Sequence, residues 1–322
     1  MKELFISGLQ VYIPDRCVSV QEYARWRLPE EEELGNPLVW MFDYYGIPFR
    51  HGYEDQISPK TGEGGGIPIF GEPVSDVLIQ YIREKAPETA SQADYVCYCH
   101  ETVEPSRTMV PALKMKKLLG MHRTVPFSIG HQGSLSPVSA MEMSHALLAA
   151  GDSKRLLLTV ADSTLLPFSR IRPVSYVLGD ALAIMWLGTA EGKYQVKHYA
   201  YATLNIERSW KQPWDSESIR EAEIRCIQSL EKLLQTIKHP VDGVILPHLS
   251  TCFLMEAGAM AASYGWPVLA RNGWGCINLL GSDPFVTLSG LEQEERTFSG
   301  QMLLLIFASV HHGAAILLLR KM

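Results

Sequence analysis

The chain has 322 residues and a net charge of −6, and 47% of its residues are hydrophobic while 20% are charged. This composition is typical of a globular protein that is long enough for a large core or for two fused halves. The mild acidity argues against nucleic acid as a partner, and no apolar run is long enough to span a membrane. The N-terminal residues lack the pattern of a signal peptide, so we expect a cytoplasmic protein with no membrane partner.

The cysteines do not form a recognisable framework. Cys97 and Cys99 share one face of a predicted strand, but no second pair completes a metal site. The other four cysteines are scattered along the chain. We therefore expect reduced cysteines, most of them in the core, and no bound metal.

The first third of the chain alternates between strand and helix patterns. Apolar runs predict strands at residues 4–9 and 94–100. Apolar residues at helical spacing predict helices at residues 74–85 and 111–119. This alternation favours an α/β fold.

Residues 124–162 predict a strand, a tight turn, a buried helix and a second strand. Ser136, followed by proline, is typical of a helix N-cap, and Gly151 ends the helix. A side chain in this turn lies at a helix N-terminus, where backbone N–H groups and the helix dipole stabilise negative charge. Ser134 therefore either caps the helix or acts as a nucleophile that carries an acyl group.

The alternation repeats in the second half, so we expect two α/β halves, residues 1–190 and 191–322. A predicted strand beginning at Val241 ends in His248, and Asn278 follows thirty residues later in a glycine-rich turn. Residues 302–309 predict a buried strand.

These motifs, in this order, resemble the thiolase-fold condensing enzymes, most closely the β-ketoacyl-ACP synthase III branch. In that family a cysteine opens the buried helix, and a small residue followed by glycine closes it about seventeen residues later. Counting back from Ala150 and Gly151 gives Ser134. The resemblance implies a thiolase-like five-layer αβαβα fold of two similar halves, with serine in place of the nucleophilic cysteine. A shift of two residues would place Gln132 there instead, as in members that only decarboxylate.

The resemblance also implies roles for residues outside the turn. His248 and Asn278 match the pair that stabilises the thioester oxyanion and a developing enolate, with Cys276 as the alternative to Asn278. Trp40 and Arg50, in the pattern W-x5-G-I-x-x-R, match residues that hold coenzyme A. The alternative for Trp40 is packing of a surface loop, and for Arg50 it is pairing with an acid.

Two further stretches resemble the family. Residues 177–183 resemble a family strand entry, in which Asp180 supports the fold and not the chemistry. Ala308 and Ser309 stand where the family has glycines that line the oxyanion hole, so the geometry of that hole differs here.

Serine changes the chemistry that the resemblance implies. A serine hydroxyl needs a neighbouring base, for which His248 is the candidate. An oxoester is less activated than a thioester, so transfer to an amine or alcohol is more feasible than carbon–carbon bond formation. We therefore expect an acyltransferase with an acyl-Ser134 intermediate.

The acyl group would come from coenzyme A or an acyl carrier protein, with no tightly bound cofactor. The expected setting is specialised lipid or polyketide metabolism, and the expected assembly is a homodimer or a heterodimer with a related subunit. Three alternatives stay open: a non-catalytic partner subunit of a condensing enzyme, a thioester hydrolase, and a decarboxylase that uses Gln132.

Overall fold

The computed structural model describes residues 2–19, 66–86, 92–102, 110–151, 155–164, 170, 176–204, 216–274 and 277–322. Trp40, Arg50 and Cys276 lie outside the described residues, so the coenzyme A contacts and the alternative to Asn278 stay predictions.

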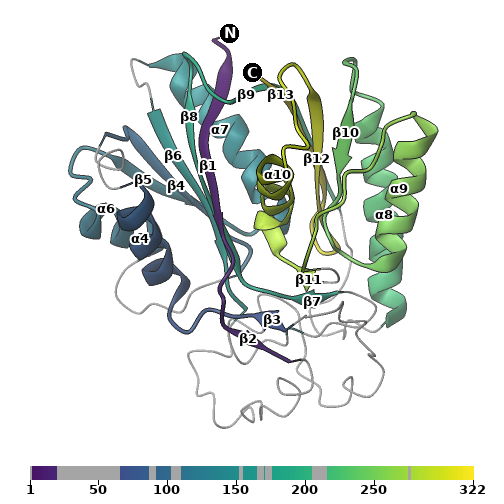
Figure 1. The fold of residues 1–322 in the computed structure, drawn as a ribbon, viewed down its shortest axis with the longest axis horizontal. Coiled ribbons are helices and arrows are strands. Elements are labelled where there is room, and N and C mark those ends of the chain that lie inside the picture. The colour runs from purple at the N-terminus through teal and green to yellow at the C-terminus, as the bar shows by residue number, and fades with distance from the viewer. Residues whose placement is uncertain are drawn as a thin grey trace.

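A nine-stranded sheet runs through the molecule in the order β10-β12-β13-β9-β1-β8-β6-β4-β5 (Figure 1). In chain order its strands are β1 (Leu4–Tyr12), β4 (Tyr95–Cys99), β5 (Val125–Ile129), β6 (Arg155–Asp162), β8 (Ala181–Gly188), β9 (Tyr194–Thr203), β10 (Gly243–Ile245), β12 (Met302–Ser309) and β13 (Gly313–Lys321). β4 pairs in parallel with both β5 and β6, and β10 pairs in parallel with β12. β1 pairs with both β8 and β9, so it joins the strands of the two predicted halves.

Two pairs of short strands lie outside this sheet. β2 (Cys17–Val18) pairs with β3 (Ile67–Pro68). β7 (Val177–Leu178) pairs in parallel with β11 (Ile277–Asn278), which places Asn278 beside Leu178.

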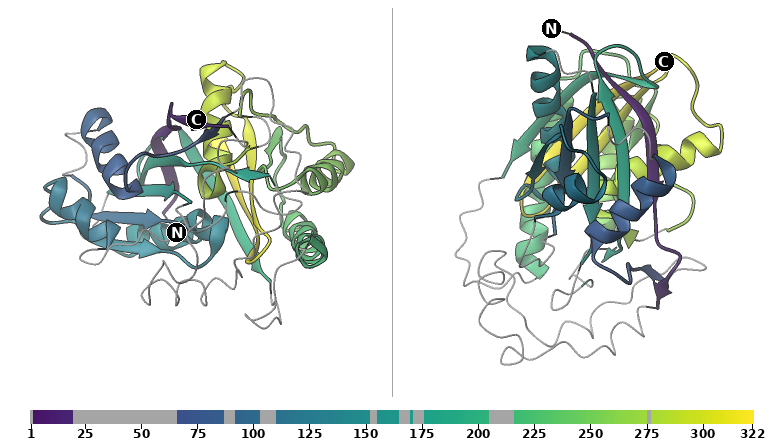
Figure 2. Two further views of the ribbon diagram at one scale, coloured as in Figure 1. Left: turned by 90° about the horizontal axis from the view of Figure 1, so that it is seen from below. Right: turned by 90° about the vertical axis from the view of Figure 1, so that its left-hand side faces the viewer.

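Six α-helices lie within the described residues, and they form three layers around the strands (Figure 2). They are α4 (Val74–Lys85), α6 (Pro111–Leu118), α7 (Ser136–Ala150), α8 (Ser216–Leu234), α9 (Thr251–Ser263) and α10 (Asp283–Gln293). α4 and α6 cover the outer side of β4, β6 and β8, while α8 and α9 cover the outer side of β12 and β13. α7 and α10 pack between the two groups of strands.

The alternation of side chains along the strands explains these layers. On β6, Leu158 and Val160 face the central helices, whereas Leu157 and Ala161 face α4 and α6. Successive side chains of a strand point to opposite faces, so a strand that is apolar at every position requires cover on both sides. The α/β class and the alternation of helix and sheet layers are confirmed.

The sequence predicts both ends of two elements correctly. The helix predicted at residues 74–85 is α4, and the strand predicted at residues 302–309 is β12. The N-cap assigned to Ser136 is wrong, because Ser136 is the first residue of α7 and its buried hydroxyl has no hydrogen-bond partner within the residues that the structure describes. Within the described residues, no helix has the length and apolarity that a membrane span requires.

Candidate active site at the start of α7

The turn between β5 and α7 is the centre of the candidate site. β5 ends at Ile129, and a short 3-10 turn, Gly133–Leu135, leads directly into α7. Gly133 has φ 55° and His131 has φ 62°, a conformation that residues with a side chain seldom adopt. Gly133 adopts this conformation freely, whereas at His131 it costs about 1–3 kcal/mol, and such strain is concentrated at functional sites.

Ser134 lies in this turn and is buried, with 4% of its surface exposed. Its hydroxyl donates a hydrogen bond of 2.6 Å to Oε2 of Glu101. Glu101 is half-buried and follows β4 after one intervening residue. Because β4 and β5 are parallel neighbours, their carboxyl ends meet at one edge of the sheet, and this brings the two side chains together.

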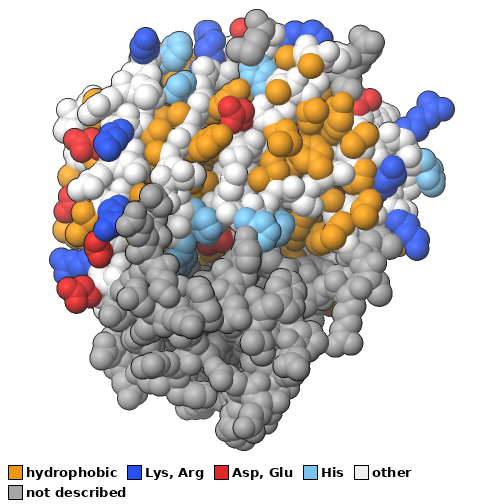
Figure 3. All heavy atoms as spheres, turned by 180° about the vertical axis from the view of Figure 1, so that it is seen from behind, with side chains coloured by type: hydrophobic (Ala, Val, Ile, Leu, Met, Phe, Trp, Pro, Cys, Tyr) orange, Lys and Arg blue, Asp and Glu red, His pale blue; other side chains and the backbone are white. Residues whose placement is uncertain are grey.

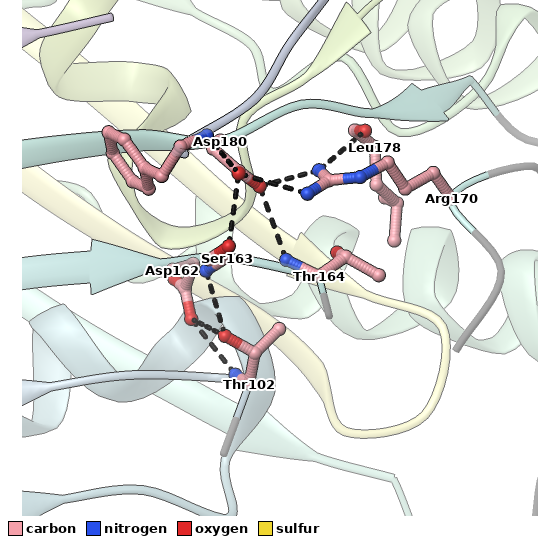
Figure 4. Close-up of polar contacts among 8 residues, drawn as sticks. Thr102, Asp162, Ser163, Thr164, Arg170, Leu178 and Asp180 are labelled. Carbon is pink, nitrogen blue, oxygen red and sulfur yellow. Dashed lines mark hydrogen bonds and ion pairs between the residues drawn. The ribbon is translucent and has the colours of Figure 1, made fainter. Parts of the chain in front are cut away.

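A second carboxyl group, Asp162, lies behind Glu101 at the end of β6. Its Oδ1 accepts hydrogen bonds from the backbone N–H (2.9 Å) and the hydroxyl (3.2 Å) of Thr102 (Figure 4). It also accepts a hydrogen bond of 2.6 Å from the backbone N–H of Glu101. Its Oδ2 is buried and has no hydrogen-bond partner among the described residues. Burial raises the pKa of Asp162 to about 7, and the nearby charge of Glu101 adds to this shift.

Sequence reasoning missed Glu101 and Asp162, although a signal for both was present. Glu101 follows one apolar strand after a single residue, and Asp162 is the last residue of another strand. Acidic residues at the carboxyl ends of neighbouring parallel strands gather at one edge of the sheet. The order of the strands, which the sequence does not state, was needed to use that signal.

His248 lies between β10 and α9, and Asp283 holds its ring. Nδ1 of His248 is 3.1 Å from Oδ1 of Asp283, and Oδ2 of Asp283 is 3.3 Å from Nη1 of Arg271. Oδ2 also accepts a hydrogen bond of 3.0 Å from the backbone N–H of Leu279. Burial alone would raise the pKa of Asp283, but the charges of Arg271 and His248 lower it below its ordinary value.

Asn278 lies in the turn that leads into α10. Its Oδ1 accepts a hydrogen bond of 2.7 Å from the backbone N–H of Leu280, so its side-chain NH₂ is the group left to act as a donor. Leu280 has φ 53°, so this turn is strained as well.

The Asn278 turn packs against the start of α7. A Cβ atom added to Gly281 would lie 3.4 Å from Cγ of Pro137, the second residue of α7, and 3.6 Å from Oδ2 of Asp162. The hydroxyl of Ser282 donates to the carbonyl of Val160 at 3.2 Å. The turn that carries Asn278 therefore lies next to the α7 turn, and Asp283 connects the Asn278 turn with His248.

Within the described residues, Ser134 and His248 are not hydrogen-bonded to each other. The Ser134 hydroxyl binds Glu101, and the His248 ring binds Asp283. Gln132, the other candidate for the nucleophile position, accepts a hydrogen bond from the hydroxyl of Ser139. Glu101 is therefore the acidic partner of Ser134, in the place where the sequence suggested His248.

Asp180 supports the loops around the site. Its carboxylate binds Arg170 through two hydrogen bonds, Nη1 to Oδ1 at 2.5 Å and Nη2 to Oδ2 at 2.9 Å (Figure 4). It also accepts from the Ser163 hydroxyl and from the backbone N–H groups of Thr164 and Phe70. These bonds join four segments of the chain, in agreement with the structural role expected for Asp180.

No group of three or more histidine, cysteine, aspartate or glutamate side chains in the described part of the chain is arranged to hold a metal ion.

No family model matches the sequence, and no curated protein matches it. Solved structures do match over nearly the whole chain. ChlB3, described as an acyltransferase, aligns with a TM-score of 0.69 at 17% identity and covers 99% of this chain and 98% of its own. The 3-oxoacyl-(acyl carrier protein) synthase III FabH of Pseudomonas aeruginosa PAO1 aligns with a TM-score of 0.66 at 17% identity, with coverage of 99% and 98%. A variant of OleA from Xanthomonas campestris aligns with a TM-score of 0.70 at 14% identity, with the same coverage. The chain thus has the thiolase-like fold of these proteins.

Proposed function

We propose that the protein is an acyltransferase that moves an acyl group from a thioester to an acceptor through an ester on Ser134. The observation that carries this proposal is the 2.6 Å hydrogen bond from the buried Ser134 hydroxyl to the Glu101 carboxylate, at the turn before α7. A serine becomes a nucleophile only beside a base, and this distance is within the range required for proton transfer.

The same turn offers donors for the charge that develops on the substrate oxygen. The backbone N–H groups of Gly133 and Ser134 have no acceptor among the described residues. They lie at the N-terminal end of α7, where the helix dipole favours negative charge. N–H groups in this position are typical donors of an oxyanion hole.

The reaction has two balanced steps. In the first, Glu101 takes the proton of Ser134, Oγ bonds to the thioester carbon, the carbon–sulfur bond breaks, and the leaving sulfur takes up the proton. In the second, the acceptor loses its proton to Glu101 and bonds to the acyl carbon, and Ser134 leaves with that proton. Glu101 thereby has the role of the base that the sequence suggested for His248.

His248 and Asn278 are assigned to the thioester oxygen in this proposal. Asn278 would donate through its side-chain NH₂, since its Oδ1 already accepts from Leu280. His248 binds Asp283 through Nδ1, so a protonated ring would donate from Nε2. Both contacts are proposals that the turn packing supports.

The solved structures of the same fold support a proposal for the substrate class. ChlB3 is described as an acyltransferase, and FabH is described as a 3-oxoacyl-(acyl carrier protein) synthase III. For this chain we propose a coenzyme A or acyl carrier protein thioester as donor, with Trp40 and Arg50 at the entrance and no tightly bound cofactor. The proposed setting is specialised lipid or polyketide metabolism in the cytoplasm.

A second candidate is a non-catalytic partner subunit of a condensing enzyme. It is favoured by the separate hydrogen bonds of Ser134 and His248, which do not form a serine–histidine pair. A thioester hydrolase differs from the first proposal only in using water as acceptor, and a decarboxylase that uses Gln132 would form no acyl-serine.

The test is intact mass spectrometry after incubation with a panel of acyl-coenzyme A and acyl carrier protein thioesters. We expect a stable acyl increment in the wild type, its absence in Ser134→Ala, and formation about 100-fold slower in Glu101→Gln. Thr287→Ala, on α10, is the matched control and keeps the increment. If the folded wild type shows neither an increment nor thioester turnover, the acyltransferase proposal fails and the partner-subunit candidate takes its place.

A further inference from the structure

Gly133 lacks a side chain, and two side chains from another part of the chain occupy the space where one would be. A Cβ atom added to Gly133 would lie 2.6 Å from Oγ of Ser309 and 2.5 Å from Nδ1 of His312. Real Cβ atoms do not approach other atoms so closely. Ser309 and His312 therefore face the residue immediately before Ser134.

These two side chains also contact each other. Ser309 is the last residue of β12, and His312 comes just before Gly313, the first residue of β13. Oγ of Ser309 is 3.0 Å from Nδ1 of His312, and 3% of the Ser309 surface is exposed. A buried serine hydroxyl within hydrogen-bond distance of an imidazole is the arrangement that activates serine nucleophiles.

The turn before α7, which faces Ser309 and His312, offers donors for the negative charge that develops on a substrate oxygen. Ser309 faces Gly133, and the backbone N–H groups of Gly133 and of the next residue, Ser134, have no acceptor in the part of the chain that the structure describes. A substrate carbonyl held by these groups would be reachable from two hydroxyls, Ser134 beside Glu101 and Ser309 beside His312. The β12–β13 turn thus brings a second nucleophile–base pair to the same oxyanion donors.

We propose that Ser309 is a second acyl-carrying hydroxyl and that His312 is its base. This inference rests on the proposed function, because it uses the same acyl thioester. The proton of Ser309 passes to Nδ1 of His312, Oγ bonds to the thioester carbon, the carbon–sulfur bond breaks, and the proton passes from His312 to the leaving sulfur. The product is an ester on Ser309 together with a free thiol.

The hydrogen bond between Ser309 and His312 also closes a turn between two strands. Its loss would therefore lower stability even if the pair had no chemical role. The test must use covalent labelling at an identified residue, which a purely structural bond does not produce.

The experiment labels the full chain with octanoyl-coenzyme A, and separately with an alkyl fluorophosphonate, and maps the adducts by peptide mass spectrometry. We expect an adduct on Ser309 that is lost in Ser309→Ala and forms about tenfold or more slowly in His312→Gln. His311→Gln is the matched control, because it changes the neighbouring histidine and keeps the Ser309–His312 pair. Thermal unfolding of each variant verifies that it is folded.

The outcomes separate this inference from the proposed function. An adduct on Ser134 alone overturns the role of Ser309 and leaves the proposed function intact. An adduct on Ser309 alone supports the inference and removes Ser134 as the nucleophile. If the folded protein is labelled at neither residue, both proposals fail.

If Ser309→Ala does not fold, Ser309→Cys keeps the test decisive. A thiol beside His312 and the α7 N-terminus should react with iodoacetamide at neutral pH, because both favour the thiolate. The reaction should slow when His312→Gln is added. A cysteine at this position that stays unreactive in the folded protein contradicts the proposed environment.

Discussion

At the scale of one residue, Asp162 has a buried carboxyl group that can hold a proton near neutral pH. Asp162 is 1% exposed, and the three hydrogen-bond donors that contact it from the described residues all bind one oxygen, Oδ1. The other oxygen, Oδ2, is buried and has no partner in the described part of the chain, and burial raises the pKa of Asp162 to about 7. Near neutral pH, the uncharged acid and the carboxylate therefore coexist a short distance behind Glu101.

This shift predicts a pH-dependent stability. The folded state binds a proton at Asp162 more tightly than the unfolded chain does, so this contribution to folding is complete below about pH 4 and is lost as the pH rises to about 7. Its size is at most about 4 kcal/mol, since each pKa unit corresponds to about 1.4 kcal/mol. Urea unfolding between pH 4 and pH 8 should show the loss in the wild type and a flatter profile in Asp162→Asn.

Asp76→Asn, on the surface of α4, is the control for this experiment and should keep the wild-type profile. A wild-type profile in Asp162→Asn as well would show that Asp162 is not the group that titrates.

The sequence could predict Ser134, His248 and Asn278 as candidates, because each stands in a local motif with a recognisable spacing. It could not predict Glu101 as the partner of Ser134, because that contact depends on β4 and β5 being neighbours. Ser309 was noted only as a departure from glycine, and its proximity to Gly133 needed the packing of the β12–β13 turn.

At the scale of elements, the first residue of α10 connects several segments. The Asp283 carboxylate contacts His248 after β10, Arg271, and the backbone of Leu279 before α10. Arg271 in turn donates to the carbonyls of Trp274 and Ile277. The position of α10 between the strands thus depends on a buried charge cluster.

Removal of the Asp283 carboxylate should therefore lower the free energy of unfolding strongly. Asp283→Ala leaves Arg271 buried without its counter-charge, and we expect a loss of about 3–5 kcal/mol in the free energy of unfolding. The matched variant Asp76→Ala removes the half-exposed partner of Lys114 and should cost about 1 kcal/mol or less. Urea unfolding of both variants at one pH compares them, and equal losses would contradict the importance of the cluster.

Element boundaries were predicted well where the apolar pattern is local. α4 and β12 were found to the residue, because helical and strand periodicity are properties of the segment itself. β10 was predicted as a longer strand ending at His248, but it pairs only over Gly243–Ile245. Its length is set by β12, its neighbour in the sheet, and pairing partners cannot be read from one segment.

At the scale of the whole molecule, β5 forms one edge of the nine-stranded sheet. The face seen from behind carries a broad group of hydrophobic side chains (Figure 3). Val125 on β5, Met143 on α7 and Tyr201 on β9 are 54%, 47% and 42% exposed. An unpaired strand edge beside exposed apolar side chains favours pairing with another chain. We therefore propose that a second copy of this chain binds along β5.

Val125→Lys should therefore disrupt the dimer, because a charged side chain on an edge strand opposes strand pairing. Sedimentation velocity should show a shift from dimer to monomer. Val110→Lys is the matched control, because Val110 is 55% exposed and precedes α6 rather than lying on the sheet edge. A monomeric wild type, or a dimer that survives the Val125 change, would contradict this assignment.

The pairing of β1 has a consequence for how the chain reaches its fold. β1 comprises Leu4–Tyr12, yet its partners β8 and β9 lie some 170 to 190 residues later in the sequence. β9 in turn pairs on its other side with β13, at the far end of the described chain. Contacts this distant along the sequence make folding slow, so during synthesis on the ribosome β1 must wait, unpaired, until its partners have emerged.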